Sequence, residues 1–160
     1  MAGPVAYVGF HKRLVATMID VAIMLAVCMP LLWAVYGNEY FTRMEPVARD
    51  MAAGAAIDPA KMPAVFAGPA DFVIQVVLPV IALFVFWRYR SATPGKMIVH
   101  AKIADAGTLG PPSNMQLVIR FFAYLVAMIP LFLGFFWIAF DERKQGWHDK
   151  IARTVVISDR

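Results

Sequence analysis

The sequence contains little charge, one cysteine and three histidines, and each shortage excludes a class of function. Charged residues make up 16% of the 160 residues, and 61% are hydrophobic. Ordinary soluble domains carry about 25% charged residues. Cys28 alone cannot form an internal disulfide, so we interpret it as a packing residue. The histidines are scattered, at His11, His100 and His148, and no ligand cluster accompanies them, so we expect no metal site.

No catalytic or cofactor motif is present either. The segment TPGK at residues 93–96 lacks the longer glycine pattern of a phosphate-binding loop, and we interpret it as a turn leading into a strand. No Ser-His-Asp arrangement is found. The net charge of +4 comes from basic residues that flank apolar segments, which disfavours nucleic acid as a partner. We therefore expect no enzyme activity and no cofactor.

What the sequence does contain is three long hydrophobic runs. Their ranges are 14–36, where Asp20 is the only charge, 70–87, which is interrupted by Asp71, Gln75 and Pro79, and 121–140. A membrane-spanning helix needs about 20 apolar residues. The sequence predicts an all-α membrane protein with two clear transmembrane helices, a third hydrophobic segment and a small cytoplasmic β element. The first run holds an acid and exceeds a signal-peptide core, so we expect it to stay uncleaved.

The basic residues predict the orientation of these spans. The N-terminal flank carries two Lys or Arg, the region 88–120 five, and the tail 141–160 five. The loop 37–69 carries three, together with four acids, and we expect a short helix in it near 45–56. Because basic loops stay inside, the loop 37–69 is predicted to be extracytoplasmic and both termini cytoplasmic.

The third run, 121–140, leaves three alternatives open. A full crossing would place the basic tail outside, whereas a re-entrant hairpin bent near Pro130 and Gly134 would keep it inside. A third alternative is that the helix begins earlier, near Asn114. Strand patterns at 96–105 and 154–157 favour an inside tail, because the two strands pair only if they lie on one side of the membrane.

The first run raises the question of what balances Asp20. Arg13 lies seven residues earlier on nearly the same helical face, about 10 Å away along the axis. A charge at mid-membrane costs about 2.5–3.5 kcal/mol on insertion scales, so it normally has a partner. Asp20 is either a structural clamp, holding another helix through Arg120 or a tail residue, or a binding site for a proton or cation. Gln75 and Pro79 mark either a distorted polar patch facing Asp20 or ordinary packing.

Four sequence blocks resemble the RDD family of bacterial membrane proteins, which is named for one arginine and two aspartates. The blocks are GFHKRLVATMID, TPGKMIVHAKIAD followed by AG, the segment around Arg120, and FDERKQGWHDKIARTVVI, and together they cover residues 9–157 after an N-terminal flank of residues 1–8. The resemblance implies that Arg13 and Asp20 are the arginine and the first aspartate. The second aspartate is Asp149, with Asp141 as the competing choice.

The resemblance implies a multi-pass protein of the bacterial inner membrane whose molecular role is largely unassigned. Transport has been suggested, and one branch is linked to sodium/proton exchange. Two or three spans cannot enclose a pathway, so transport would require a homo-oligomer, with protons or monovalent cations as ligands. The alternative is an accessory protein whose basic cytoplasmic face binds anionic lipid or a partner. Under either hypothesis we expect an ion-binding or structural polar network made of Arg13, Asp20, Arg120, Asp141, His148 and Asp149.

Overall fold

The computed structural model describes residues 5–56, 58–59, 62, 64, 66–130 and 133–159. Parts of the predicted flank (1–4), of the loop 37–69 (57, 60, 61, 63 and 65) and of the third run (131–132) lie outside these residues, as does residue 160. The chain forms two compact units. Unit 1 comprises residues 1–22 and 82–160, and unit 2 comprises residues 23–81.

The described residues are mostly helical, as predicted. The helices are α1 (Phe10–Tyr36), α2 (Glu39–Thr42), α3 (Glu45–Ala52), α4 (Pro69–Phe72), a π-helix (Val73–Val77), α5 (Leu78–Arg90), α6 (Pro94–Ile98), α7 (Asn114–Met128), α8 (Leu133–Phe136), a 3₁₀ helix (Trp137–Ala139) and α9 (Trp147–Ile151). The segments Phe10–Tyr36 and Pro69–Ile98 are long and apolar enough to cross a membrane. Many of their apolar side chains are exposed on the chain itself, as expected of surfaces that face lipid.

One predicted strand begins later than expected. The range 96–105 was predicted to be a strand, but its first residues continue α6, and the strand β1 covers only Ala101–Asp105. The reason is local, because the Thr93 side chain accepts a hydrogen bond from the Lys96 amide and Pro94 occupies the first helical position. Both features start a helix. The predicted turn at TPGK is therefore a helix start.

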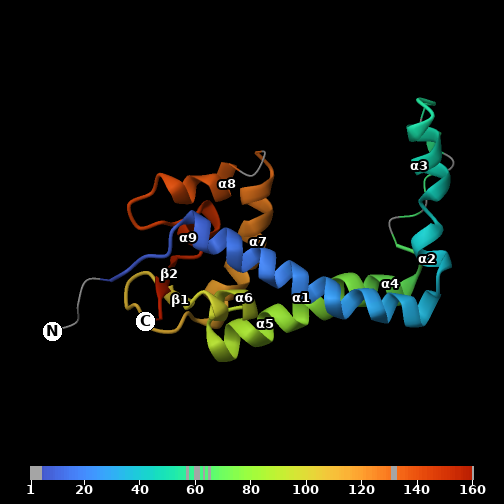
Figure 1. The fold of residues 1–160 in the computed structure, drawn as a ribbon. Coiled ribbons are helices and arrows are strands. Elements are labelled where there is room, and N and C mark those ends of the chain that lie inside the picture. Colours follow the sequence, from blue (N-terminus) through green and yellow to red (C-terminus); the bar gives the residue numbers. More distant parts are fainter. Residues whose placement is uncertain are drawn as a thin grey trace. The chain divides into compact units, whose positions relative to one another are not determined.

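The predicted pairing of the two strands is confirmed. β1 runs antiparallel to β2 (Thr154–Ser158), with Ala101 opposite Ser158. The N-terminal segment extends this sheet, since the Val8 amide donates to the Val156 carbonyl at 2.9 Å. In Figure 1 the sheet lies beside α6 and α9. The buried core of unit 1 packs this sheet against the N-terminal segment, α5 and α7. It comprises Val8, Trp87, Ala101, Ile103, Leu117 and Val156.

The third hydrophobic run is a bent element. Its helix α7 begins at Asn114, where Ser113 and Gln116 form a reciprocal capping box. The axis of α7 and that of the segment Leu133–Ala139 are inclined by 113°. The early start and the bend agree with two of the predicted alternatives. The element is either a broken span or a re-entrant hairpin.

Unit 2 is built around the second half of α1 and the π-helix. Cys28, Leu32 and Ile74 form its buried cluster, with Tyr36 and Tyr40 packed against it. The Cys28 thiol donates to the Ile74 carbonyl at 3.4 Å, which agrees with the predicted packing role. The predicted helix near 45–56 is α3, which ends at Ala52.

Candidate functional site

A buried cluster in unit 1 joins three of the predicted residues. Asp149, the third residue of α9, is fully buried and contacts Arg13 of α1 and Arg120 of α7. Arg13 is 7% exposed and Arg120 is 1% exposed. The three residues are separated by up to 136 positions in sequence. We call this group the double-arginine cluster.

Arg13 uses every nitrogen of its guanidinium group. Its Nη1 donates to Asp149 Oδ2 at 2.5 Å, and its Nε donates to the Val8 carbonyl at 2.9 Å. Its Nη2 donates to the Lys144 carbonyl at 2.5 Å. Lys144 turns that carbonyl toward Arg13 with a backbone φ of +52°, an uncommon value for a residue with a side chain. Arg13 therefore ties α1 to the N-terminal segment, the tail loop and α9.

Arg120 approaches the same carboxylate from α7. Its Nη1 donates to Asp149 Oδ1 and, at 2.6 Å, to the Thr154 hydroxyl, and its Nη2 donates to the Tyr124 hydroxyl at 3.4 Å. Its guanidinium carbon lies 5.8 Å from the centre of the Trp87 ring. The Nε of Arg120 has no partner among the described residues. These contacts join α7 to α9 and to the start of β2.

The electrostatics of the double-arginine cluster favour an ionised Asp149. Burial alone would raise the pKa of Asp149, but the Arg120 and Arg13 guanidinium groups outweigh this effect and hold the pKa below its ordinary value. The Gly146 amide adds a hydrogen bond of 2.9 Å to Oδ2. The cluster then contains two positive charges and one negative charge. A buried group of this kind is strongly destabilised when one partner is removed.

His148 lies beside the cluster as a neutral aromatic side chain. Burial lowers its pKa to about 3, so the ring is uncharged near neutral pH. The ring stacks on Tyr124 at 4.4 Å and lies 5.0 Å from the ring of Phe135, measured between centroids. Its Nε2 lies 3.5 Å from Asp149 Oδ2. His148 therefore packs against the cluster without contributing a charge.

Asp20 forms a separate contact, which we call the Asp20 clamp. Its carboxylate accepts hydrogen bonds from the Thr93 hydroxyl at 2.5 Å and from the Gly95 amide at 2.7 Å. One of the two alternatives left open for Asp20 was a clamp through Arg120 or a tail residue, but its partners are Thr93 and Gly95. The clamp attaches α1 to the first turn of α6, and it needs a small residue at position 95. A Cβ there would overlap the Ala16 carbonyl and the Asp20 carboxyl group.

Asp141 does not pair with Arg13. Its Oδ1 forms an ion pair with Lys150, and its Oδ2 accepts from the amides of Arg143 and Gln145, each at 3.1 Å. Burial would raise the pKa of Asp141, but the bond from Lys150 and these amide bonds lower it. Asp141 therefore shapes the loop that leads into α9. Between the two candidates for the second family aspartate, Asp149 is the one in contact with Arg13.

A second buried aspartate, in unit 2, was missed as a site. Asp71 is fully buried and accepts from the Ala67 amide at 2.7 Å, from the Tyr40 hydroxyl at 3.1 Å and from Gln75. Arg43 lies 3.7 Å from its Oδ2. In the sequence, Asp71 stands out only as an interruption at the edge of a hydrophobic run. Its position after Gly68 and Pro69, at the start of a helix, was the signal that could have found it.

The contacts of these groups are hydrogen bonds and ion pairs. No group of three or more His, Cys, Asp or Glu that could hold a metal ion occurs among the described residues. The double-arginine cluster and the Asp20 clamp both connect elements that lie far apart in sequence. Thr93, Gly95 and Thr154 complete them; the sequence patterns predicted a turn at TPGK and a strand at 154–157 but gave these three residues no role in a polar site.

Comparisons with known proteins identify the family of the chain. Residues 7–153 match the RDD family. The chain is 44% identical over 82 residues to Uncharacterized protein RP437 of Rickettsia prowazekii (strain Madrid E); the match spans 51% of this chain and 45% of that protein. No solved structure matches the chain. This chain is a membrane protein that belongs to the RDD family.

Proposed function

We propose that this protein is a non-transporting accessory protein of the bacterial inner membrane. Its motif residues lock the first span, the third hydrophobic segment and the tail together. The resulting basic face lies on the cytoplasmic side and binds anionic phospholipid. The observation that carries the proposal is the complete engagement of Asp149, which is fully buried between two arginines and a backbone amide.

A carboxylate that carries ions must exchange its partners during each cycle. Asp149 could do so only by leaving two buried guanidinium groups without their counter-charge, which is strongly unfavourable. Asp20 in turn holds α6 through Thr93 and Gly95. Releasing it would detach α6 from α1. A structural role for both family aspartates accounts for these contacts.

The pairing of distant segments supports a topology with both ends on one side. The residues near Val8, the strand β1 and the strand β2 form hydrogen bonds with one another. Segments that pair in this way lie on the same side of a membrane. Two long apolar helices separate the first segment from β1, and a bent element separates β1 from β2. The basic residues flanking these segments favour the cytoplasmic side.

The test is an ion-flux measurement on purified protein in proteoliposomes. An internal pH dye is followed after Na⁺, K⁺ or Li⁺ is added outside, and wild type is compared with Asp20→Asn at matched incorporation. We expect no cation-dependent proton movement from either protein. Movement by wild type that is lost in Asp20→Asn would overturn the accessory role.

A second candidate function is proton or cation exchange at Asp20. The observation that favours it is that both hydrogen-bond donors to this carboxylate, a hydroxyl and a backbone amide, are neutral, although it lies within a long apolar helix. A carboxylate with neutral partners can take up a proton or a monovalent cation. With so few spans, this function would require several copies of the chain around one pathway. The same flux assay decides between the two candidates.

A further inference from the structure

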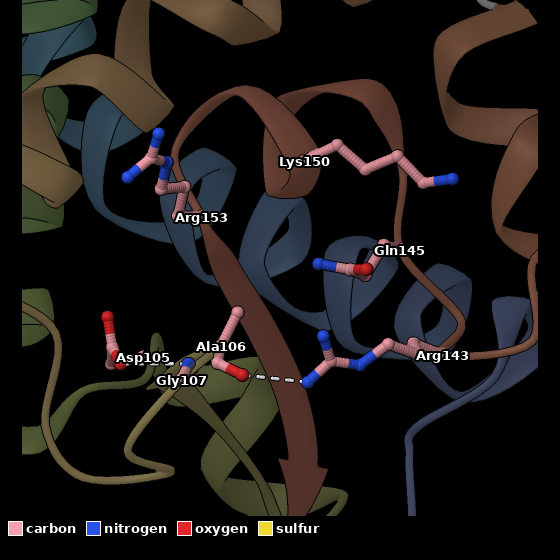
Figure 2. Close-up of a pocket in the computed structure, with 7 residues that line it drawn as sticks. All are labelled: Asp105, Ala106, Gly107, Arg143, Gln145, Lys150 and Arg153. Carbon is pink, nitrogen blue, oxygen red and sulfur yellow. Dashed lines mark hydrogen bonds between the residues drawn. The ribbon is translucent and has the colours of Figure 1, made fainter.

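A pocket opens beside the turn after β1 in unit 1, and none of the three residues of the double-arginine cluster lines it. It has a volume of about 510 Å³ and lies between the turn after β1 and the tail, as Figure 2 shows. The residues that line it are Asp105, Ala106, Gly107, Arg143, Gln145, Lys150 and Arg153. Three of these side chains are basic and one is acidic, so the pocket is suited to an anion.

The acidic residue of the pocket is already engaged. The Asp105 carboxylate accepts from the Thr108 amide at 2.7 Å, from Gln116 Nε2 at 2.5 Å and from the Gly107 amide at 2.9 Å. Together these hydrogen bonds lower the pKa of Asp105 to about 2, and the bond from the Thr108 amide contributes most to the lowering. Asp105 therefore holds the turn in shape, and its lone pairs are directed to donors of the chain itself.

Arg143 is held in place without a counter-charge. Its Nη2 donates to the Ala106 carbonyl at 2.7 Å, a bond drawn in Figure 2, and its Nε donates to the Tyr7 hydroxyl at 3.4 Å. Within the described part of the chain, neither Arg143 nor Arg153 forms an ion pair with a carboxylate. A guanidinium group that neutral acceptors hold in place, and that forms no ion pair with a carboxylate, is positioned to donate hydrogen bonds to a phosphate group.

The surroundings of Lys150 connect the pocket to a membrane surface. Lys150 forms an ion pair with Asp141, and its ammonium nitrogen lies 5.7 Å from the centre of the Trp137 ring. The segment that carries Trp137 exposes large apolar side chains, namely Leu133, Phe136, Trp137 and Phe140. Exposed aromatic residues next to basic ones are typical of segments that lie at the membrane interface.

From these contacts we propose that the pocket binds the phosphate group of an anionic phospholipid, with Arg143 and Arg153 as its main ligands. The proposal rests on the accessory function proposed above and gives that function a binding site. Arg143 supplies the oriented donors, and Arg153 supplies a second charge from the start of β2. Lys150 lies between the pocket and the apolar segment. The acyl chains then extend along the exposed residues of that segment into the bilayer.

The experiment measures lipid binding to the full chain in neutral detergent micelles by native mass spectrometry. Dioctanoyl phosphatidylglycerol is titrated against wild type, Arg153→Gln and Arg143→Gln/Arg153→Gln, with dioctanoyl phosphatidylcholine as the neutral headgroup. The matched control is Arg88→Gln/Arg90→Gln, which removes two exposed arginines outside the pocket. Two further arms replace the lipid by glycerol phosphate and by inorganic phosphate.

We expect wild type to prefer the anionic lipid, and Arg153→Gln to weaken this binding about fivefold, as loss of about 1 kcal/mol would. The double pocket variant should weaken it further, and the control should resemble wild type. Arg153→Gln is the decisive variant if the double variant fails to fold, because within the described residues the Arg153 side chain forms no hydrogen bond and no ion pair. Equal losses in the pocket and control variants would overturn the site, as would equal binding of both lipids.

The measurements with glycerol phosphate and inorganic phosphate show whether the bound phosphate group comes from a lipid or from a dissolved ligand. Glycerol phosphate or inorganic phosphate binding as strongly as the lipid would overturn the lipid source and assign the pocket to a dissolved ligand. Failure of the pocket is also distinct from failure of the accessory function. If Arg153→Gln binds lipid as wild type does and no ion flux is found, only the proposed phosphate site is contradicted. Ion flux in proteoliposomes that is lost in Asp20→Asn contradicts the accessory function, whatever the result of the lipid titration.

Discussion

Both units of the molecule bury an aspartate at the same helical position, and they balance its charge in different ways. Asp149 and Asp71 are each the third residue of a short helix that follows a glycine. Each carboxylate reaches back to a backbone amide, that of Gly146 or that of Ala67. This local device satisfies an amide at the start of the helix. Beyond this shared bond, the two aspartates have different partners.

The tertiary partners of Asp149 are charged and distant, whereas those of Asp71 are mainly neutral. Asp149 contacts two buried arginines from other helices. Asp71 accepts from Tyr40 and Gln75, and Arg43 approaches it only to 3.7 Å with a partly exposed side chain. Removing the charge of Asp149 therefore leaves two cations buried, and removing that of Asp71 leaves a carbonyl that can still accept. The comparison predicts unequal effects for the same substitution.

The largest effect is expected for Asp149→Asn. The substitution leaves Arg13 and Arg120 buried without a counter-charge, and we expect the free energy of unfolding to fall by about 3–5 kcal/mol. Denaturation in mixed micelles, followed by circular dichroism, measures this change. Asp159→Asn is the matched control, since Asp159 forms an exposed pair with Lys102. A loss below about 1 kcal/mol in Asp149→Asn would show that the cluster is not a structural lock.

A second prediction concerns the pH dependence of stability, which we expect to differ between the two units. Because the folded chain lowers the pKa of His148 from 6.5 to about 3, the unfolded chain binds more protons between these values. Stability is therefore fully present above pH 6.5 and is lost as the pH falls toward 3. From pH 7 to pH 5 we expect a loss of about 2 kcal/mol, measured by denaturation at each pH.

Two variants test the origin of this pH dependence. His148→Phe keeps an aromatic ring in the stack with Tyr124 and should flatten the profile, whereas the exposed His11→Gln should leave it unchanged. Unit 2 contains no histidine, so its local opening, measured by hydrogen exchange, should lack this slope. A profile of equal steepness in wild type and His148→Phe would assign the slope to other groups.

The smallest effect is expected for Asp71→Asn. The asparagine oxygen can still accept from the Ala67 amide, and the Tyr40 hydroxyl can turn to accept from the new side-chain amide, so we expect the free energy of unfolding to fall by only about 1–2 kcal/mol. The same denaturation assay and hydrogen exchange in α2 and α3 measure it. A loss as large as that of Asp149→Asn would mean that Arg43 balances Asp71 more strongly than its 3.7 Å separation indicates.

Parts of the fold followed from the sequence because their causes are local. Hydrophobic length predicted the two spanning helices, and alternation of β-branched residues predicted both strands and their pairing. The start of the predicted strand at 96 was wrong because the cap at Thr93 and the proline after it outweigh the alternating pattern. Such caps act over a few residues, so the helix start at TPGK has a local cause that is present in the sequence.

The partners of the polar residues could not be predicted in the same way. Alternatives for Asp20 included Arg120 and the tail, because charge alone ranks a cation above a hydroxyl or an amide. The fold places Thr93 and Gly95 there, and the small residue at 95 allows the approach. Similarly, Asp149 and Asp141 competed as the second family aspartate, and which of them contacts Arg13 depends on the path of the loop before α9. These are geometric outcomes of packing.

The sequence by itself determined that the chain is a membrane protein with a polar pattern of the RDD type, because hydrophobic length and residue identity are properties of the chain. The tertiary structure alone decided which charges meet. Arg13 and Asp149 are 136 residues apart in sequence, and the fold brings their side chains to 2.5 Å. Buried charges interact over a few ångströms, so their effect depends on distances that no local pattern encodes.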